Sequence, residues 1–255
     1  MKISLITVCF NSASTICRTF ESVLNQTYQN IEYIVVDGGS TDTTIDLIKR
    51  YEGAFNGRMC WISEPDNGMY DAMNKGIRLA SGDIIGILNS DDRYAHNDVL
   101  NLVYKQFKTY GSQSVYGDLF YVDDDKPYRY WRAGTQRPFA SGWMPPHPAF
   151  FVKKIIYENY GLFRLDCGTA ADYELMLRFI EKQGISTSYI PKPLVLMQRG
   201  GRSGDGIKSR LRAAVFDDYA WEINGLHPAP YTFLFKKLSK IKQFVCVPLH
   251  SLNRI

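Results

Sequence analysis

Residues 84–92 read Ile84-Ile85-Gly86-Ile87-Leu88-Asn89-Ser90-Asp91-Asp92, an unbroken apolar run that ends on an amide, a hydroxyl and two carboxylates. An apolar run without polar alternation is typical of a strand covered on both faces, as in a parallel sheet. Adjacent carboxylates repel each other, so Asp91 and Asp92 favour a compensating cation, and oxygen ligands suit Mg²⁺ or Mn²⁺. The alternative is a solvated loop in which one of the two acids caps the next helix.

Similar strand and helix pairs precede this segment along the chain. Apolar, mostly β-branched strands are predicted at residues 2–8, 31–36 and 59–63. A helix is expected after each strand: the first ends at Gln26, the second ends at Tyr51, and the third spans residues 69–80. Alternating strands and helices of this kind predict an α/β fold with a mostly parallel sheet and helices on both faces.

Polar residues follow the predicted strands at Asn11, Asp37 and Asp91. An open parallel sheet gathers these positions along one edge, which is where such folds bind ligands. The carboxylate of Asp37 is suited to accept a hydrogen bond from a nucleobase, and the turn that contains Asp66 is expected close to it. The edge therefore suits a nucleotide whose phosphates reach a metal ion.

Regularity decreases after a helix expected at 97–109. Later strands are predicted at 114–121, 128–131, 185–190 and 194–197, and later helices at 171–181 and 207–223. A stretch rich in proline and glycine covers 134–148. We therefore expect a donor-binding half at 1–110, an acceptor-binding and catalytic half of the same domain at 111–225, and a tail at 226–255.

The composition fits one globular body, with 45% apolar and 22% charged residues in 255. Five cysteines without paired spacing predict a reducing compartment. Neither a secretory leader nor an apolar stretch long enough to span a bilayer is recognisable, so we expect a protein of the cytoplasm or of the inner face of the cell membrane. We expect no nucleic-acid partner.

In order and spacing, the segments 6–11, 35–42, 63–76 and 82–92 resemble glycosyltransferase family 2, whose members have the GT-A fold. The resemblance covers about residues 3–205 and is strongest to enzymes of bacterial colanic acid, O-antigen and capsule assembly. It implies a Rossmann-like sheet flanked by helices. It also implies an inverting, metal-dependent transferase of hexosyltransferase type, which moves a sugar from a nucleotide sugar, commonly a UDP-sugar, to a saccharide acceptor carried on a lipid diphosphate.

The resemblance assigns roles at the sheet edge. Thr7 matches the position where the first strand meets the base, and Asp37 matches the acid that reads the base, commonly uracil. Asp91 and Asp92 match the DxD-type motif, with Asp92 favoured as the direct metal ligand and Asp91 as the partner of the ribose or the metal. The chain departs from the family at Asn89, where an aspartate is common.

Other donor-binding candidates flank the edge: Asn11, Asp66, Lys75, Arg199, Arg202 and Ser203. Lys75 either supplies a charge near the donor or is a solvated lysine on a helix. The glycine-rich basic loop 198–204 suits a diphosphate, which its backbone N–H groups and guanidinium groups can wrap, or is a plain flexible loop. Met73 stands where the family often has an arginine in the base pocket.

A second candidate site begins the helix expected at 171–181. From the residues alone, Asp172 is either a first-turn carboxylate favoured by the helix dipole or a functional acid. The resemblance makes it the general base that takes the acceptor hydroxyl proton, with Ala171 in place of the usual glutamate. Glu174 should face away from it. His147 matches a histidine near the acceptor, or is structural.

The tail carries apolar residues at helical spacing, with lysines largely elsewhere around the helix. The apolar residues are Tyr231, Leu234, Phe235, Leu238, Ile241 and Val245. A basic amphipathic helix predicts peripheral membrane contact through 230–250, and docking onto the protein's own core is the alternative.

Two rival functions fit parts of the pattern. A sugar nucleotidyltransferase also joins a parallel sheet to metal-binding acids, but it calls for a glycine-rich basic loop after the first strand, where this chain has Cys9-Phe10-Asn11-Ser12. A carbohydrate- or nucleotide-binding module without catalysis is suggested by Asn89 and Ala171, which replace acids.

Overall fold

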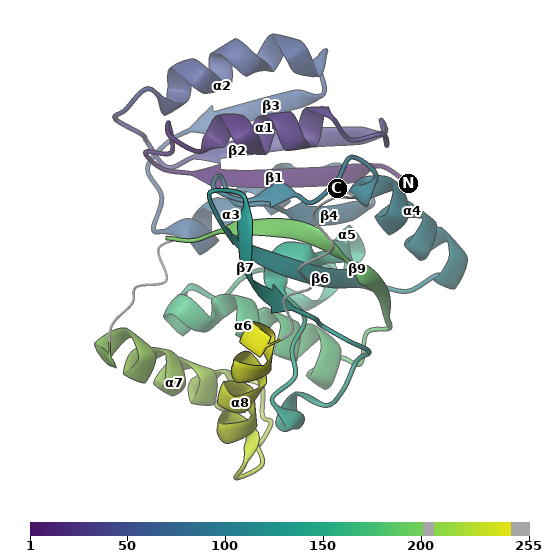
Figure 1. The fold of residues 1–255 in the computed structure, drawn as a ribbon, viewed down its shortest axis with the longest axis vertical. Helices are drawn as coiled ribbons and strands as arrows, with labels where there is room; N and C mark the ends of the chain where they lie inside the picture. Colours follow the sequence, from purple (N-terminus) through teal and green to yellow (C-terminus); the bar gives the residue numbers. More distant parts are fainter. Residues whose placement is uncertain (201–206, 246–255) are drawn as a thin grey trace.

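The computed structural model describes residues 1–200 and 207–245. Among these residues, one nine-stranded sheet has the strand order β3-β2-β1-β4-β8-β6-β9-β5, and β7 joins it by pairing with β6. Helices lie on both faces of the sheet (Figure 1). The α/β class expected from the sequence is confirmed.

The first part of the sheet is parallel, as the repeated strand and helix pattern predicts. β1 pairs in parallel with β2 and β4, and β2 pairs in parallel with β3. The strands are β1 (Ile3–Cys9), β2 (Ile31–Asp37), β3 (Met59–Ser63) and β4 (Ile84–Ile87). The helices that alternate with them are α1 (Ile16–Leu24), α2 (Thr44–Glu52), α3 (Met69–Leu79) and α4 (Val99–Tyr110). Parallel pairing brings the carboxyl ends of these strands to one edge.

Each of these strands contributes to two separate cores. Leu5 and Tyr33 pack with α1, α2 and α4 on one face, whereas Ile6 and Ile34 pack with α3 on the other. Successive side chains of a strand point to opposite faces, so a strand covered on both sides needs apolar residues at every position. The unbroken apolar runs of the sequence have this cause.

The second part of the sheet is mixed. β8 lies antiparallel between β4 and β6, β6 pairs in parallel with β9, and β5 closes the edge antiparallel to β9. The strands are β5 (Arg93–Tyr94), β6 (Ser114–Asp123), β7 (Lys126–Trp131), β8 (Phe150–Lys153) and β9 (Thr187–Gln198). The separate strands predicted at 185–190 and 194–197 are thus one strand, whose register against β6 shifts beside Asp118.

Four helices complete the described chain: α5 (Lys154–Tyr160), α6 (Ala171–Met176), α7 (Ile207–Glu222) and α8 (Thr232–Val245). Short 3-10 turns lie at Gly53–Phe55, Phe139–Ser141, His147–Ala149 and Leu165–Ala170. The helix expected at 171–181 continues beyond α6 as π-helical turns at Leu177–Lys182. Of the expected elements, that helix alone changes its hydrogen-bonding pattern midway.

The tail helix α8 packs against β7 and the turn at Phe139–Ser141. Thr232 Oγ1 donates to the carbonyl oxygen of Ala140 at 2.9 Å, and Arg129 Nε donates to Gln243 Oε1 at 2.8 Å. Docking onto the protein's own core, one of the two alternatives for this segment, is therefore observed. Within residues 1–200 and 207–245, none of the helices has the length and apolar character needed to cross a membrane.

Candidate functional site

The acidic loop after β4 is largely buried. Asp92 is 1% exposed; its carboxylate accepts hydrogen bonds from Asn89 Nδ2 and from the backbone N–H of Gln198, each at 3.2 Å. The hydroxyl of Thr19 donates to the backbone oxygen of Asp92 at 2.8 Å, which ties the loop to α1. Burial, followed by the charge of Asp91, raises the pKa of Asp92 well above its ordinary value. Burial likewise raises the pKa of Asp91.

These residues fit a divalent metal ion. The raised pKa values reflect the cost of burying two neighbouring carboxylates, a cost that a cation would offset. Asn89 Oδ1 is buried and has no hydrogen-bond partner among the described residues, so one further oxygen ligand is free. In that same part of the chain, no three His, Cys, Asp or Glu side chains group together as a metal site. The loop therefore offers a partial ligand set that a phosphate could complete.

A cavity of about 200 Å³ opens beside Asp91. Its lining residues are Ser14, Thr15, Arg18, Asp91, Arg93, Asp124 and Gln198. Arg18 and Arg93 both pair with Asp125, at the turn between β6 and β7, and the nearest Arg18 contact is 3.7 Å. Ion pairs between arginine and aspartate side chains therefore lie beside the cavity next to the acidic loop.

Asp37 ends β2 and organises the turn that follows it. Its carboxylate accepts hydrogen bonds from the N–H of Gly39 at 3.1 Å, the N–H of Ser40 at 2.9 Å and the hydroxyl of Ser63 at 2.7 Å. Burial opposes ionisation, but the hydrogen bonds from Ser40 and Ser63 lower the pKa of Asp37 overall. The side chain is fully buried. A direct contact with a base remains a prediction; the observed role is to fix the turn.

The remaining candidates near this edge have defined partners. Asn11 Oδ1 accepts from the N–H of Thr41 at 2.8 Å, which joins the loops after β1 and β2. Thr7 is buried and accepts from the hydroxyl of Tyr33 at 2.8 Å, inside the core. Thr7 therefore supports the edge from beneath.

The side chain of Asp66 packs against Gly38, where a Cβ atom would collide with it, so the expected closeness of Asp66 to the Asp37 turn is observed. Lys75 Nζ lies 2.8 Å from both Glu64 Oε1 and the carbonyl oxygen of Pro65. These two contacts tie Lys75 and α3 to the segment that leads into the helix, and a charge near the donor remains a prediction.

The loop after β9 is only partly described. Arg199 donates to Asp123 Oδ2 at 3.1 Å and lies over the ring of Tyr128, so it contacts the turn between β6 and β7. The predicted donor contacts of Arg202 and Ser203 fall on residues outside the described chain.

Asp172 lies in the first turn of α6 and has a distinctive set of neighbours. Burial and the charge of Asp172 raise the pKa of Tyr70 well above its ordinary value. Burial lowers the pKa of His147, although Asp172 opposes this shift. The structure thus brings Asp172, His147 and Tyr70 together from three separate segments. The sequence predicted the first two; Tyr70 follows a glycine turn and carries no local signal of its own.

Tyr121, near the end of β6, is within electrostatic reach of both acidic sites. Its pKa is raised to about 12, first by burial and in smaller part by the charges of both Asp92 and Asp172. The guanidinium of Arg129 stacks on its ring at 4.2 Å from the centroid. Tyr121 is therefore one side chain that lies near both the loop after β4 and the start of α6.

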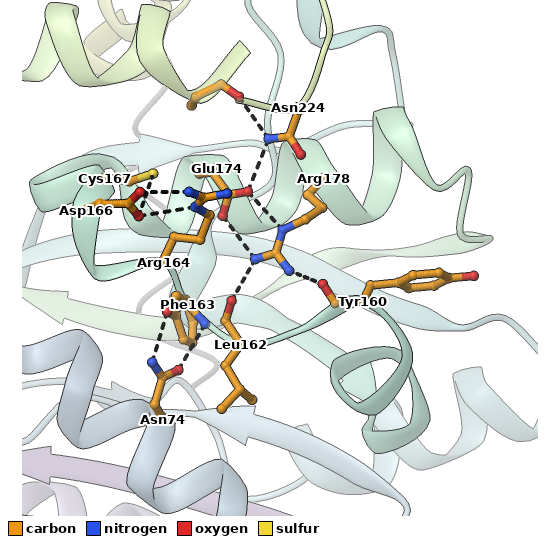
Figure 2. Close-up of polar contacts among 11 residues, drawn as sticks. Asn74, Tyr160, Leu162, Phe163, Arg164, Asp166, Cys167, Glu174, Arg178 and Asn224 are labelled. Atoms are coloured by element: carbon orange, nitrogen blue, oxygen red, sulfur yellow. Dashed lines mark hydrogen bonds and ion pairs between the residues drawn. The ribbon is translucent and has the colours of Figure 1, made fainter. Parts of the chain in front are cut away.

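A buried network holds α6 in place (Figure 2). Glu174 is fully buried and accepts hydrogen bonds from Arg178 at 2.8 and 3.0 Å and from Asn224 at 3.1 Å. Arg178 also donates to the carbonyl oxygens of Tyr160 and Leu162. Glu174 points away from the site and into this network, as its place two residues after Asp172 predicts. The network joins α6 to α7 and to the segment after α5.

The sequence of this chain has clear relatives. A family model described as "Glycosyl transferase family 2" matches residues 4–169. An uncharacterized glycosyltransferase of Mycobacterium tuberculosis is 37% identical over 183 residues, which are 69% of this chain and 68% of the relative. A PGL/p-HBAD biosynthesis glycosyltransferase of Mycobacterium bovis is 28% identical over 188 residues, or 73% of each chain.

Solved structures share the fold. Staphylococcus aureus TarS 1–349 in complex with UDP-GlcNAc superimposes with a TM-score of 0.66 at 17% identity, covering 96% of this chain and 79% of that one. The mannosyltransferase PcManGT from Pyrobaculum calidifontis, in complex with GDP-Man and Mn²⁺, gives a TM-score of 0.63 at 17% identity, covering 97% and 76%. The expected GT-A type of fold is confirmed.

Proposed function

The chain belongs to glycosyl transferase family 2 and is a glycosyltransferase, and we propose that it moves a sugar from a UDP-sugar to a saccharide acceptor carried on a lipid diphosphate. We further propose that the reaction depends on a divalent metal, inverts the anomeric carbon and serves the assembly of a bacterial surface polysaccharide. The UDP-GlcNAc held by TarS and the GDP-Man and Mn²⁺ held by PcManGT support a nucleotide-sugar donor and a metal. This family assignment favours transfer over the rival nucleotidyltransferase reaction.

The observation that carries the proposal is the position of Tyr121. The charges of both Asp92 and Asp172 help to raise its pKa, so both acids lie within electrostatic reach of this one side chain. A donor whose diphosphate lies at Asp92 would therefore present its sugar toward Asp172. This is the arrangement that a single displacement needs, with the leaving group and the general base on opposite sides of the reacting carbon.

At the donor end, Asp92, Asp91 and Asn89 Oδ1 would hold the metal ion, and the bound ion would neutralise charge that develops on the leaving diphosphate. We propose that Asp37 and Asn11 shape the base and ribose end through the turns that they fix. Asp66, Lys75 and Thr7 support these turns. Arg199 would contact the diphosphate after releasing Asp123.

At the acceptor end, Asp172 accepts the proton of the acceptor hydroxyl while that oxygen attacks the anomeric carbon. The new carbon–oxygen bond forms as the bond to the diphosphate breaks, so the configuration inverts. His147 contributes an uncharged ring near neutral pH, because burial lowers its pKa. A neutral ring suits hydrogen bonding to a sugar hydroxyl without pairing with the base. Ala171 leaves Asp172 as the acid at this position.

The outward face of α8 supports contact with a membrane surface. The helix packs on the core through Thr232, Gln243 and the partly buried Phe233, whereas several of its other apolar residues are exposed. The exposed residues are Leu234, Phe235, Leu238 and Ile241, with Tyr231 just before the helix and Phe244 beside Arg129 of β7. The exposed side chains of Lys237 and Lys240 accompany them. We propose that this outward face rests on anionic lipid at the cytoplasmic surface, close to a lipid-linked acceptor.

The experiment that tests the proposed reaction is mass spectrometry of products. The protein is incubated with Mn²⁺, a panel of UDP- and GDP-sugars and synthetic lipid-diphosphate saccharides. A product heavier by one hexose or N-acetylhexosamine residue, formed from a UDP-sugar, is the expected result. Transfer from the GDP-sugars alone, or no transfer from any pair, would overturn the donor assignment.

A further inference from the structure

Lys236 of α8 reaches the helix that carries Asp172. Its ammonium lies 2.7 Å from Asp217 Oδ2 of α7 and 3.4 Å from the centroid of the Tyr173 ring. Tyr173 is the residue after Asp172, and its hydroxyl accepts a hydrogen bond from Trp221 Nε1 at 2.9 Å. Trp221 of α7 and Lys236 of α8 thus both contact the first turn of α6.

The approach of α8 at this point is close and specific. A Cβ atom at Gly142 would collide with the backbone of Lys236, so only glycine there lets the helix lie this near. The side chain of Lys236 is 12% exposed and that of Asp217 is 17% exposed. A nearly buried ion pair is costly to form and is seldom more stabilising than apolar side chains of the same size. Stability alone therefore gives little reason for a lysine at this position.

Lys236 and Asp217 both interact electrostatically with Asp172. Burial lowers the pKa of Lys236, while Asp217 and, more weakly, Asp172 oppose that shift, and Lys240 adds to it. Burial raises the pKa of Asp217. The charge of Lys236 opposes this increase, and the charge of Asp172 adds to it. Glu181 also faces Tyr173, and the charge of Asp172 also acts on the pKa values of Tyr70, Tyr121 and His147. Lys236 and Asp217 thus act on the base with opposite signs.

We infer that Lys236 is a positioning residue for the transfer reaction: through Tyr173 and its pair with Asp217 it fixes the orientation and charge environment of Asp172. This inference rests on the proposed role of Asp172 as the general base. The consequence is that α8 belongs to the acceptor end of the catalytic site and is more than a tail docked on the surface. The same helix presents exposed apolar residues on its other side, so one element connects the catalytic site with the proposed membrane surface.

The test compares pH profiles of three variants, Lys236→Met, Asp217→Asn and the double variant, using hydrolysis of a UDP-sugar as the assay. The donor is whichever of UDP-glucose, UDP-galactose and UDP-N-acetylglucosamine the wild type hydrolyses fastest with Mn²⁺, followed by UDP release. Loss of the lysine charge should move the acid limb of kcat to higher pH by roughly half a unit. Loss of the aspartate charge should move it to lower pH, and the double variant should lie between them.

Shifts of the acid limb in opposite directions for Lys236→Met and Asp217→Asn, with an unchanged KM for the donor, support the inference. A merely structural role would lower kcat in both variants without shifting the acid limb. The control is Lys49→Met, an exposed lysine on α2, which should keep the wild-type profile. If Lys236→Met does not fold, Lys236→Arg should keep the acid limb at the wild-type pH. The shift of that limb in Asp217→Asn then tests the inference by itself. Profiles that coincide with wild type overturn the inference but not the proposed function. A wild-type protein that hydrolyses none of the donors overturns both.

Discussion

The carboxylate of Asp92 accepts a hydrogen bond from the backbone N–H of Gln198, 3.2 Å away and 106 residues further along the chain. This bond ties the acidic loop after β4 to the last residue of β9, where the basic loop begins. The donor end of the site is therefore built where the loop between β4 and β5 meets the end of β9, the strand with which β5 pairs.

Replacement of Asp92 by Asn should lower transfer by about 10²–10³, because the loop loses the charge that would face the metal and the diphosphate. The measurement is steady-state release of UDP, with circular dichroism to verify folding. Asp46→Asn, an exposed acid on α2, is the matched control and should keep near-normal turnover. Equal rates for the two variants would refute the assignment of Asp92.

Metal binding should be weak until the nucleotide arrives. Two carboxylates and one free amide oxygen leave most positions around a divalent ion to be completed by phosphate or water. Calorimetry should show little Mn²⁺ binding to the free protein and clear binding once UDP is present. Tight binding by the free protein would contradict this description of the loop.

Removal of one partner of the Glu174–Arg178 pair should lower the free energy of unfolding strongly. Glu174 is fully buried and the side chain of Arg178 is 11% exposed, so Glu174→Ala leaves a largely buried guanidinium without its carboxylate partner and should cost about 3–5 kcal/mol. Glu158→Ala removes the other i,i+4 pair, whose carboxylate is 51% exposed, and should cost less than about 1 kcal/mol. Urea unfolding compares the two. Similar losses would show that the network in Figure 2 does not hold α6.

Binding to anionic vesicles should depend on the outward face of α8. The double variant Leu234→Glu and Ile241→Glu puts charge on two exposed apolar positions and should weaken binding at least about tenfold. The test is co-sedimentation with vesicles containing phosphatidylglycerol. Leu79→Glu, at an exposed apolar position of α3, is the control and should bind like wild type. Undiminished binding by the α8 variant would exclude this surface.

The first four strands and the acidic loop could be predicted from the sequence because their signals are local. An apolar run covered on both faces and a polar residue at its end are visible within ten residues, as at Ile84–Ile87 and Asp92. β8 was missed for a local reason as well. Pro146 and Pro148 dominate the stretch before it, and the four residues of β8 carry too short a pattern to outweigh them.

The neighbours of Asp172 could not be predicted, because nothing near Tyr70 or Tyr121 in sequence records a contact made only by folding. The orientation of α8 was open for a different reason. Helical spacing identifies an apolar face, but the same spacing fits that face turned inward or outward. Lys236 and Gln243, on the opposite face, make the contacts that decide the outcome.

The central claim is that Asp172 removes the acceptor proton across the site from a donor held at Asp92. Its most direct test is the turnover of Asp172→Asn beside its affinity for UDP, both with Mn²⁺. The expected result is a loss of transfer of about a hundredfold or more with UDP affinity unchanged, because the base acts on the acceptor and not on the nucleotide. A folded Asp172→Asn variant that turns over near the wild-type rate would contradict the account.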